Sequence, residues 1–215
     1  MSYKYILFDL DGTLTDSFEG ITKSFQYALS AYGIEENCEN LRRVIGPPLI
    51  DSFCNFYNFD YETGLKAVEK YRERYTEVGW KENALIDGTD KMLRDVKNSG
   101  KILALATSKP YFYASKIVEF FGIDKYFDFV CGAELDGSIS TKTQVVEKVL
   151  GLLDNPDNES VLMVGDRIDD VVGASNCGID CVCIRSGYAE EGELENSNAK
   201  RIFDTVESLT EFLVL

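Results

Sequence analysis

The sequence predicts an α/β protein in which a parallel sheet is interrupted by an inserted helical segment. Short apolar runs of strand length recur along the chain, and helical patterns separate the later ones. Strands that alternate with helices pair in parallel through right-handed crossovers. One long stretch between the first two runs breaks this alternation, because it contains helical patterns and no convincing strand.

The expected strands are short, apolar and rich in β-forming residues, as strands buried on both faces are. The first includes Tyr5, Ile6, Leu7 and Phe8, and the fourth includes Val161, Leu162, Met163 and Val164. In all, we expect five strands, at about residues 4–9, 101–107, 127–132, 160–165 and 180–185.

The inserted stretch spans residues 16–82. Apolar residues recur there with helical spacing, beginning at Phe18, Ile21 and Phe25. Pro47-Pro48 breaks the middle of the stretch and can start a new helix. We therefore expect four helices, which either pack on the sheet or form a separate lid. Their aromatic residues are expected to form a helical core rather than ligand contacts.

Acidic residues follow two of the predicted strands. Asp9 and Asp11 come directly after the first strand, and Gly12 then permits a sharp turn. Asp166 and Asp170 follow the fourth strand. Open α/β sheets bind ligands at the carboxyl ends of their strands, and carboxylates that converge there can hold a hard cation such as Mg²⁺.

Composition narrows the classes of function. The formal charge is −15, from 22 Lys and Arg against 37 Asp and Glu, which argues against nucleic acid or an anionic membrane as the partner. The chain contains no His, which excludes Ser-His-Asp and Cys-His triads and His-ligated zinc. Several of the six Cys fall in apolar runs, as buried thiols of a reducing compartment do.

Four motifs in the correct order resemble those of the haloacid dehalogenase superfamily, whose members are mostly phosphatases. Asp9-Leu10-Asp11-Gly12-Thr13 resembles the first signature, and Gly165-Asp166-Arg167 with Asp170 resembles the last. Thr107 ends the second strand as the second motif's hydroxyl residue does, and Lys142 precedes an apolar helix as the third motif's lysine does. Thr107-Ser108-Lys109-Pro110 and Arg167 most resemble the phosphoglycolate-phosphatase-like branch.

The resemblance covers essentially the whole chain and favours the lid interpretation. It implies a Rossmann-like parallel-sheet core formed by residues 1–15 and 83–215. Residues 16–82 would form the inserted four-helix cap, of the type called C1 in this superfamily, which closes over a small substrate.

The resemblance also implies roles for the acidic residues. Asp9 would be the nucleophile that forms an aspartyl-phosphate, and Asp11 would protonate the leaving group and then deprotonate water. Asp9, Asp166 and the main-chain carbonyl of Asp11 would bind Mg²⁺. Asp170 would support the metal indirectly, although Asp169 is a rival for that place.

Hydroxyl and basic residues complete the implied site. Thr107, with the backbone N–H of Ser108 at a helix start, would bind phosphoryl oxygens, although Thr107 alone could be an ordinary helix N-cap. Lys142 would stabilise negative charge on the phosphoryl group and Asp9. Lys109 is the rival for that role, although its match to the phosphoglycolate-phosphatase pattern implies a supporting or substrate contact. In the lid, Arg43 and Gly46 could face the substrate, although a solvated Arg42-Arg43 pair is an equal alternative.

The expected activity is that of a Mg²⁺-dependent phosphomonoesterase acting on a small phosphorylated metabolite, either a 2-phosphoglycolate-like acid or a nucleoside 5'-monophosphate. A phosphosugar mutase of the same superfamily is the alternative, and a non-catalytic phospho-accepting protein is a third hypothesis. We expect no nucleic acid or membrane partner, and a monomer or homodimer. No signal peptide or membrane-spanning run is apparent, so the cytoplasm is the expected location.

Overall fold

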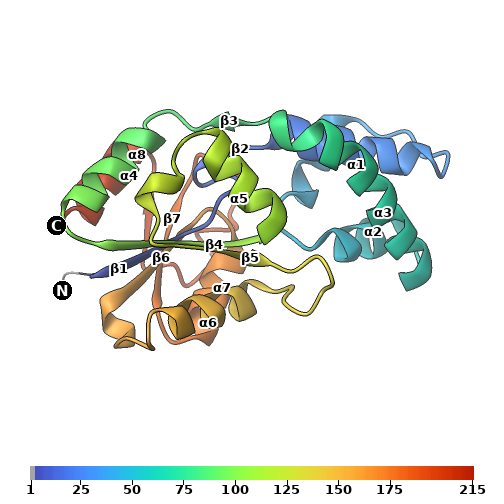
Figure 1. The fold of residues 1–215 in the computed structure, drawn as a ribbon. Coiled ribbons are helices and arrows are strands. Elements are labelled where there is room, and N and C mark those ends of the chain that lie inside the picture. Colours follow the sequence, from blue (N-terminus) through green and yellow to red (C-terminus); the bar gives the residue numbers. More distant parts are fainter. Residues whose placement is uncertain (1–2) are drawn as a thin grey trace. The chain divides into compact units, whose positions relative to one another are not determined.

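The computed structural model describes residues 3–215, which divide into two compact units (Figure 1). Unit 1 contains the described residues up to Thr15 together with Leu85–Leu215, and unit 2 contains Asp16–Ala84. The chain therefore leaves unit 1 once, builds unit 2 and returns.

Unit 1 contains a six-stranded sheet in the order β5-β4-β1-β6-β7-β8, and all of its strand pairs are parallel. Its strands are β1 (Tyr5–Phe8), β4 (Ile102–Pro110), β5 (Phe129–Ala133), β6 (Val161–Gly165), β7 (Asp180–Ile184) and β8 (Arg201–Phe203). The five predicted strands are confirmed. The sixth, β8, was missed because it is a three-residue edge strand in which only Phe203 is fully buried.

Helices cover both faces of this sheet (Figure 1). On one face lie α6 (Lys142–Leu152) and α7 (Ile168–Asn176), and on the other lie α4 (Thr89–Asn98), α5 (Tyr111–Phe120) and α8 (Val206–Leu213). Short 3-10 helices, η3 (Asp124–Tyr126) and η4 (Asn158–Ser160), precede β5 and β6. Because alternate strand residues point to opposite faces, this two-sided cover explains the continuous apolar runs in the sequence.

Unit 2 is helical, with an aromatic core. Its elements are α1 (Phe18–Ser30), the 3-10 helix η1 (Cys38–Val44), α2 (Leu49–Tyr57), α3 (Tyr61–Glu77) and the 3-10 turn η2 (Gly79–Lys81). The four expected helices are thus three α-helices and η1, and Pro48 precedes α2 as predicted. Phe25 and Phe53 stack with their ring centroids 4.0 Å apart, and Tyr71 meets Phe25 edge-on at 6.4 Å. The aromatic residues therefore form the expected core.

The two crossings between the units are short strands that pair with each other. These are β2 (Thr15–Asp16) and β3 (Ala84–Leu85), which form a two-stranded sheet of their own. Neither was predicted, because a strand of two residues leaves no apolar run in the sequence.

Two further predictions concern the state of the cysteines and the presence of a membrane-spanning helix. All six cysteines are free, and Cys131, Cys181 and Cys183 are buried, as their apolar surroundings predicted. Within residues 3–215, no helix has both the length and the apolar character needed to cross a membrane.

Candidate active site

Strand pairing brings the two acidic motifs together at the carboxyl edge of the unit 1 sheet. The ends of β1 and β6 are in register, with Phe8 opposite Val164. The N–H of Asp9 donates to the carbonyl oxygen of Val164 at 2.9 Å, which continues the pairing one residue past β1. Asp9 and Asp166 therefore leave adjacent strands at the same level.

Three carboxylates converge at this edge. Each of Asp9, Asp166 and Asp170 offers an oxygen, and these atoms lie within 4.8 Å of one another. The residues are 7%, 0% and 1% exposed, respectively. Like charges that are buried away from solvent repel one another strongly. The fully ionised cluster is therefore stable only if cations lie beside it.

Lys142 supplies one cation. It is the first residue of α6, whose start is fixed by a capping box between Thr141 and Gln144. Its Nζ lies 2.5 Å from Asp9 Oδ1 and 2.8 Å from Asp170 Oδ1, and it donates to the Ala106 carbonyl oxygen at 3.0 Å. Burial alone would lower the pKa of the ammonium, but the carboxylates of Asp170 and Asp9 outweigh burial and raise it. Lys142 therefore stays charged.

Asp170 secures both Lys142 and the turn after β6. Its Oδ2 accepts the N–H groups of Asp166 and Arg167, at 3.0 and 3.1 Å, while its Oδ1 faces Lys142. Burial raises its pKa to about 6, with Lys142 acting in the opposite direction and Asp9 adding to the rise. Asp169, its rival in the sequence, is exposed. Of the two residues, Asp170 is the one placed to support a metal.

Asp166 is fully buried and held from two sides. Its Oδ2 accepts the N–H of Tyr188 at 2.6 Å, and its Oδ1 accepts the Thr13 hydroxyl at 3.2 Å. Burial raises the pKa of Asp166 well above its ordinary value, and the charges of Asp170 and Asp9 raise it further. Sequence reasoning missed Tyr188, because it acts through a backbone N–H that any residue except proline would supply.

Three glycines let the backbone close around these carboxyl groups. A Cβ at Gly12, whose φ is +85°, or at Gly187 would overlap the Asp166 carboxylate, and one at Gly165 would overlap that of Asp170. Gly12 was expected to permit the turn. Its closeness to Asp166, and the role of Gly187, arise only in the folded chain.

Asp11 faces a different lysine. Its Oδ2 lies 2.6 Å from Lys109 Nζ, and the two side chains are 11% and 5% exposed. Its other oxygen, Oδ1, is buried and has no hydrogen-bond partner among the described residues. The two aspartates of the first motif thus have separate lysine partners, Lys142 for Asp9 and Lys109 for Asp11.

The second motif departs from expectation in its secondary structure. The helix expected to start at Ser108 begins at Tyr111, so Thr107 is not its N-cap. Instead β4 runs on to Pro110, with a register shift against β5 between Thr107 and Pro110. Pro110 has no N–H, which interrupts regular pairing there. The Thr107 hydroxyl accepts the Lys109 N–H at 3.2 Å.

Arg43 and Gly46 lie in unit 2, in η1 and just after it. The Arg43 guanidinium carbon lies 4.6 Å from the centroid of the Phe56 ring, so this side chain packs on the aromatic residues of its own unit. Gly46 has a φ of +110°. Their contact with a substrate stays a prediction.

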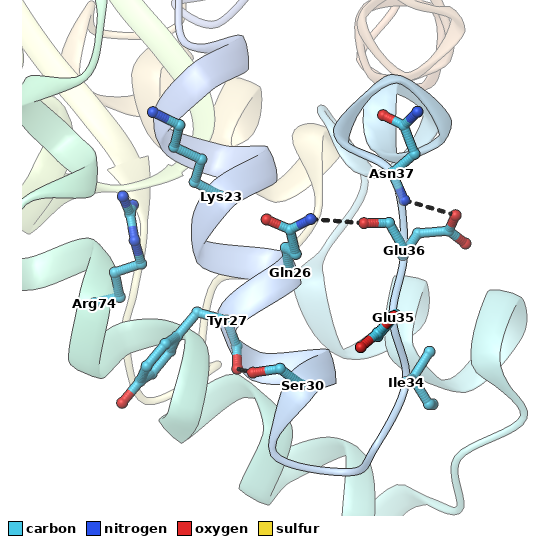
Figure 2. A pocket seen from close by; sticks show the side chains of 9 residues that line it. All are labelled: Lys23, Gln26, Tyr27, Ser30, Ile34, Glu35, Glu36, Asn37 and Arg74. Atoms are coloured by element: carbon cyan, nitrogen blue, oxygen red, sulfur yellow. Dashed lines mark hydrogen bonds between the residues drawn. The ribbon is translucent and has the colours of Figure 1, made fainter.

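Unit 2 also contains an open hollow of about 880 Å³, and none of the predicted site residues is among those that line it (Figure 2). Figure 2 shows Gln26 donating to the main-chain oxygen of Glu36, a bond of 2.7 Å. Lys23 and Arg74 in its wall are paired with Glu19 and Glu82. These two cations thus pair with carboxylates of their own unit.

The residues of the unit 1 edge fit a divalent cation. All the side-chain donors are carboxylate oxygens, which Mg²⁺ prefers. Lys109 pairs with Asp11, and Lys142 pairs with Asp9 and Asp170, whereas no lysine pair is found for Asp166 among the described residues. Four carboxylates therefore share two ammonium groups, and two negative charges remain unbalanced when all are ionised. Asp9, Asp166 and Asp170 are the side chains that could hold the metal. Coordination by the Asp11 carbonyl stays a prediction.

Comparison with known proteins accounts for this arrangement. Residues 6–184 match the haloacid dehalogenase-like hydrolase family. The chain belongs to this family. The resemblance inferred from the four motifs is thus confirmed, as is the prediction that the protein is a hydrolase of the phosphatase class.

Relatives in this family span nearly the whole chain. A 5'-nucleotidase of Pseudomonas aeruginosa is 43% identical over 197 residues, which are 90% of this chain and 88% of the relative. A protein of Mycobacterium tuberculosis named tyrosine-protein kinase PtkA is 36% identical over 99% of this chain and 73% of its own. The crystal structure of a predicted phosphatase from Clostridium acetobutylicum superposes with a TM-score of 0.96 and 40% identity, covering 100% of this chain and 99% of that one.

Proposed function

We propose that this hydrolase is a Mg²⁺-dependent phosphomonoesterase that works through an aspartyl-phosphate on Asp9. The observation that supports this most is the buried pairing of Asp9 with Lys142 at 2.5 Å, beside Asp166. A carboxylate held next to a fixed cation can approach a dianionic phosphate without prohibitive repulsion. When bound, Mg²⁺ would neutralise the phosphoryl oxygens and align the phosphate for in-line displacement.

In the first half-reaction, an Asp9 carboxylate oxygen attacks phosphorus and the ester P–O bond breaks. Asp11 gives its proton to the departing alkoxide, which is too basic to leave unprotonated. Lys142 and Thr107 stabilise the charge on Asp9 and on the phosphoryl oxygens. In the second half-reaction, water attacks the phosphoryl group and gives its proton to Asp11. Inorganic phosphate leaves, and Asp9 returns to the carboxylate.

For the substrate we propose a nucleoside 5'-monophosphate in preference to a 2-phosphoglycolate-like acid. The support is the 43% identity to a relative named 5'-nucleotidase, whereas a relative named phosphoglycolate phosphatase is 25% identical. Unit 2 would act as the lid, with Arg43 and Gly46 contacting the part of the substrate beyond its phosphate.

The test is phosphate release from nucleoside 5'-monophosphates, 2-phosphoglycolate and hexose phosphates, with Mg²⁺ and with EDTA. We expect turnover only with Mg²⁺, and a loss of at least about a thousandfold in Asp9→Asn. Asp169→Asn is the matched control, because Asp169 is an exposed carboxylate of the same segment. It should retain wild-type activity.

Two results would overturn the proposal. A folded wild-type protein that releases phosphate from no ester is not a phosphomonoesterase. A protein that instead isomerises a hexose phosphate, and only with a sugar bisphosphate present, is the phosphosugar mutase of the alternative hypothesis.

A further inference from the structure

Lys109 occupies a place that the proposed mechanism leaves without a role. Lys109 is only 8% exposed, although its side chain ends in a charged ammonium group. A buried charge of this kind requires a partner of opposite charge. That partner is Asp11 Oδ2, at 2.6 Å. From the sequence, Lys109 was expected to make a supporting or substrate contact, but in the structure it contacts the general acid itself.

The backbone around Lys109 explains how it reaches Asp11. The register shift at the end of β4 lies between Thr107 and Pro110 and therefore includes Lys109. The Lys109 N–H donates to the Thr107 hydroxyl at 3.2 Å, which fixes the main chain at this irregularity. The ammonium thus projects from an anchored strand end rather than from a mobile loop, and it can hold a carboxylate in one orientation.

The two oxygens of Asp11 differ in a way that suits proton transfer. Oδ2 is held by Lys109, whereas Oδ1 is buried and has no hydrogen-bond partner among the described residues. A buried carboxylate oxygen without a donor is unfavourable unless a ligand supplies one. In the proposed mechanism, Oδ1 would donate the proton of Asp11 to the leaving oxygen and would then accept a proton from the attacking water.

We propose that Lys109 is the positioning residue of the acid–base step: it fixes Asp11 through Oδ2 and so presents Oδ1 to the leaving group. This inference rests on the proposed function, because it needs Asp11 to act as general acid. Lys109 itself touches no reacting atom in this scheme. Lys142 has the corresponding relation to the nucleophile, so each catalytic aspartate has its own lysine.

The leaving group provides the test. The ratio kcat/KM reports phosphoryl transfer to Asp9, and that step needs a general acid for an alkyl ester but not for p-nitrophenyl phosphate, whose phenolate leaves unprotonated. We expect Lys109→Met to lower kcat/KM for a nucleoside 5'-monophosphate by about 10- to 100-fold and for p-nitrophenyl phosphate by less than about threefold. Asp11→Asn should show the same pattern, and the double variant should lose no more than Asp11→Asn alone.

Lys101→Met is the matched control. Lys101 is also 8% exposed, precedes the other end of β4 and donates to the Tyr3 carbonyl oxygen at 2.7 Å. It should lower the melting temperature without any dependence on the leaving group. If Lys109→Met does not fold, Lys109→Gln removes the charge with less change in polarity, and the same ratio is measured.

The possible outcomes are distinct. If wild type hydrolyses neither ester, the proposed function has failed. If wild type is active but the Lys109 variant loses the two substrates equally, or only raises KM for the nucleotide, Lys109 is a structural or substrate-binding residue and the inference is wrong. Additive losses in the double variant would also contradict it, because they would place Lys109 in a role separate from Asp11.

Discussion

Each unit holds a group of partly or fully buried charges, and the two groups are built on opposite principles. In unit 2, Arg74 donates to both carboxylate oxygens of Glu82, at 2.7 and 2.8 Å. Hydrogen bonding to Arg74 lowers the pKa of Glu82, although partial burial opposes this. Lys23 Nζ also lies 3.8 Å from Glu82 Oε1, so the negative charge of this carboxylate is compensated by cations of its own unit.

The carboxyl edge of unit 1 is not balanced in this way. Carboxylates outnumber ammonium groups there, and burial raises the pKa of both Asp166 and Asp170. The comparison teaches that a matched pair contributes to the stability of its unit. An unmatched cluster instead lowers stability until a cation or substrate completes it, as functional sites often do.

Among the tests of this contrast, Asp166→Asn should have the largest effect. Removing one of the crowded negative charges should raise the metal-free melting temperature by about 2–4 °C while phosphatase activity falls at least about a hundredfold. Thermal unfolding in EDTA and in Mg²⁺, together with phosphate release, measures both effects. Mg²⁺ should raise the melting temperature of wild type but not of the variant. A variant that is less stable in EDTA would show that the cluster is not strained.

Gly12→Ala and Gly33→Ala compare the stability cost of a Cβ in the active site with its cost in an ordinary surface turn. Both glycines have positive φ, +85° and +71°, but a Cβ at Gly12 would overlap Asp166 and Tyr188, whereas Gly33 has open space. We expect Gly33→Ala to cost about 1 kcal/mol from backbone strain alone. Gly12→Ala should cost about 2–5 kcal/mol, because overpacking adds to the strain. If both variants lose the same free energy of unfolding in urea, the contacts of Asp166 and Tyr188 with Gly12 add nothing to the cost of the substitution.

Glu82→Gln should lower the stability of unit 2 without changing the rate of ester hydrolysis substantially. Leaving Arg74 without its carboxylate should cost about 1–3 kcal/mol, and the folded variant should hydrolyse esters within about twofold of wild type. The single tryptophan, Trp80, lies in unit 2, so its fluorescence follows the unfolding of that unit. Glu73→Gln is the control: Glu73 and its partner Lys70 are 54% and 35% exposed, so the loss of this pair should change stability much less than Glu82→Gln does.

The pH dependence of stability should have opposite signs in the two units. Without metal, folded Asp170 keeps its proton to about pH 6, whereas the unfolded chain releases it near about pH 4. Stability of unit 1 should therefore fall as pH rises between these values, and Asp170→Asn should flatten the slope. Glu82, whose pKa is lowered, contributes above its unfolded value and loses that contribution as pH falls below about 4. Melting temperatures in EDTA from about pH 2 to about pH 7, followed by Trp80 fluorescence and by circular dichroism, measure both slopes.

The sequence predicted those features that depend on long or directly readable patterns. Apolar runs located β1 and the other long strands, and the acidic residues after β1 and β6 predicted that carboxylates meet at one edge. The two-residue strands β2 and β3 left no pattern to read. The expected helix start at Ser108 was wrong because β4 continues through its irregular end to Pro110.

The contacts within the site depend on how the backbone turns and on which atoms then face one another, and a sequence does not show either. The sequence predicted a supporting or substrate contact for Lys109, and its pairing with Asp11 depends on how the backbone turns at the end of β4. Tyr188 acts through its backbone, so its side chain carries no signal. Gly165 and Gly187 matter through the atoms they lack, and only the folded chain shows which neighbours would collide.

The position of β1 inside the sheet has a consequence for synthesis on the ribosome. Tyr5 is made before both of its partners, because it pairs with Ile102 on one side and Val161 on the other. The apolar strand β1 therefore stays unpaired on both edges until the residues of β4 and β6 have emerged. Unit 2, whose helices are continuous in the chain, is complete at Ala84 and is the first part able to fold. Vectorial synthesis thus produces the inserted unit before the scaffold into which it is inserted.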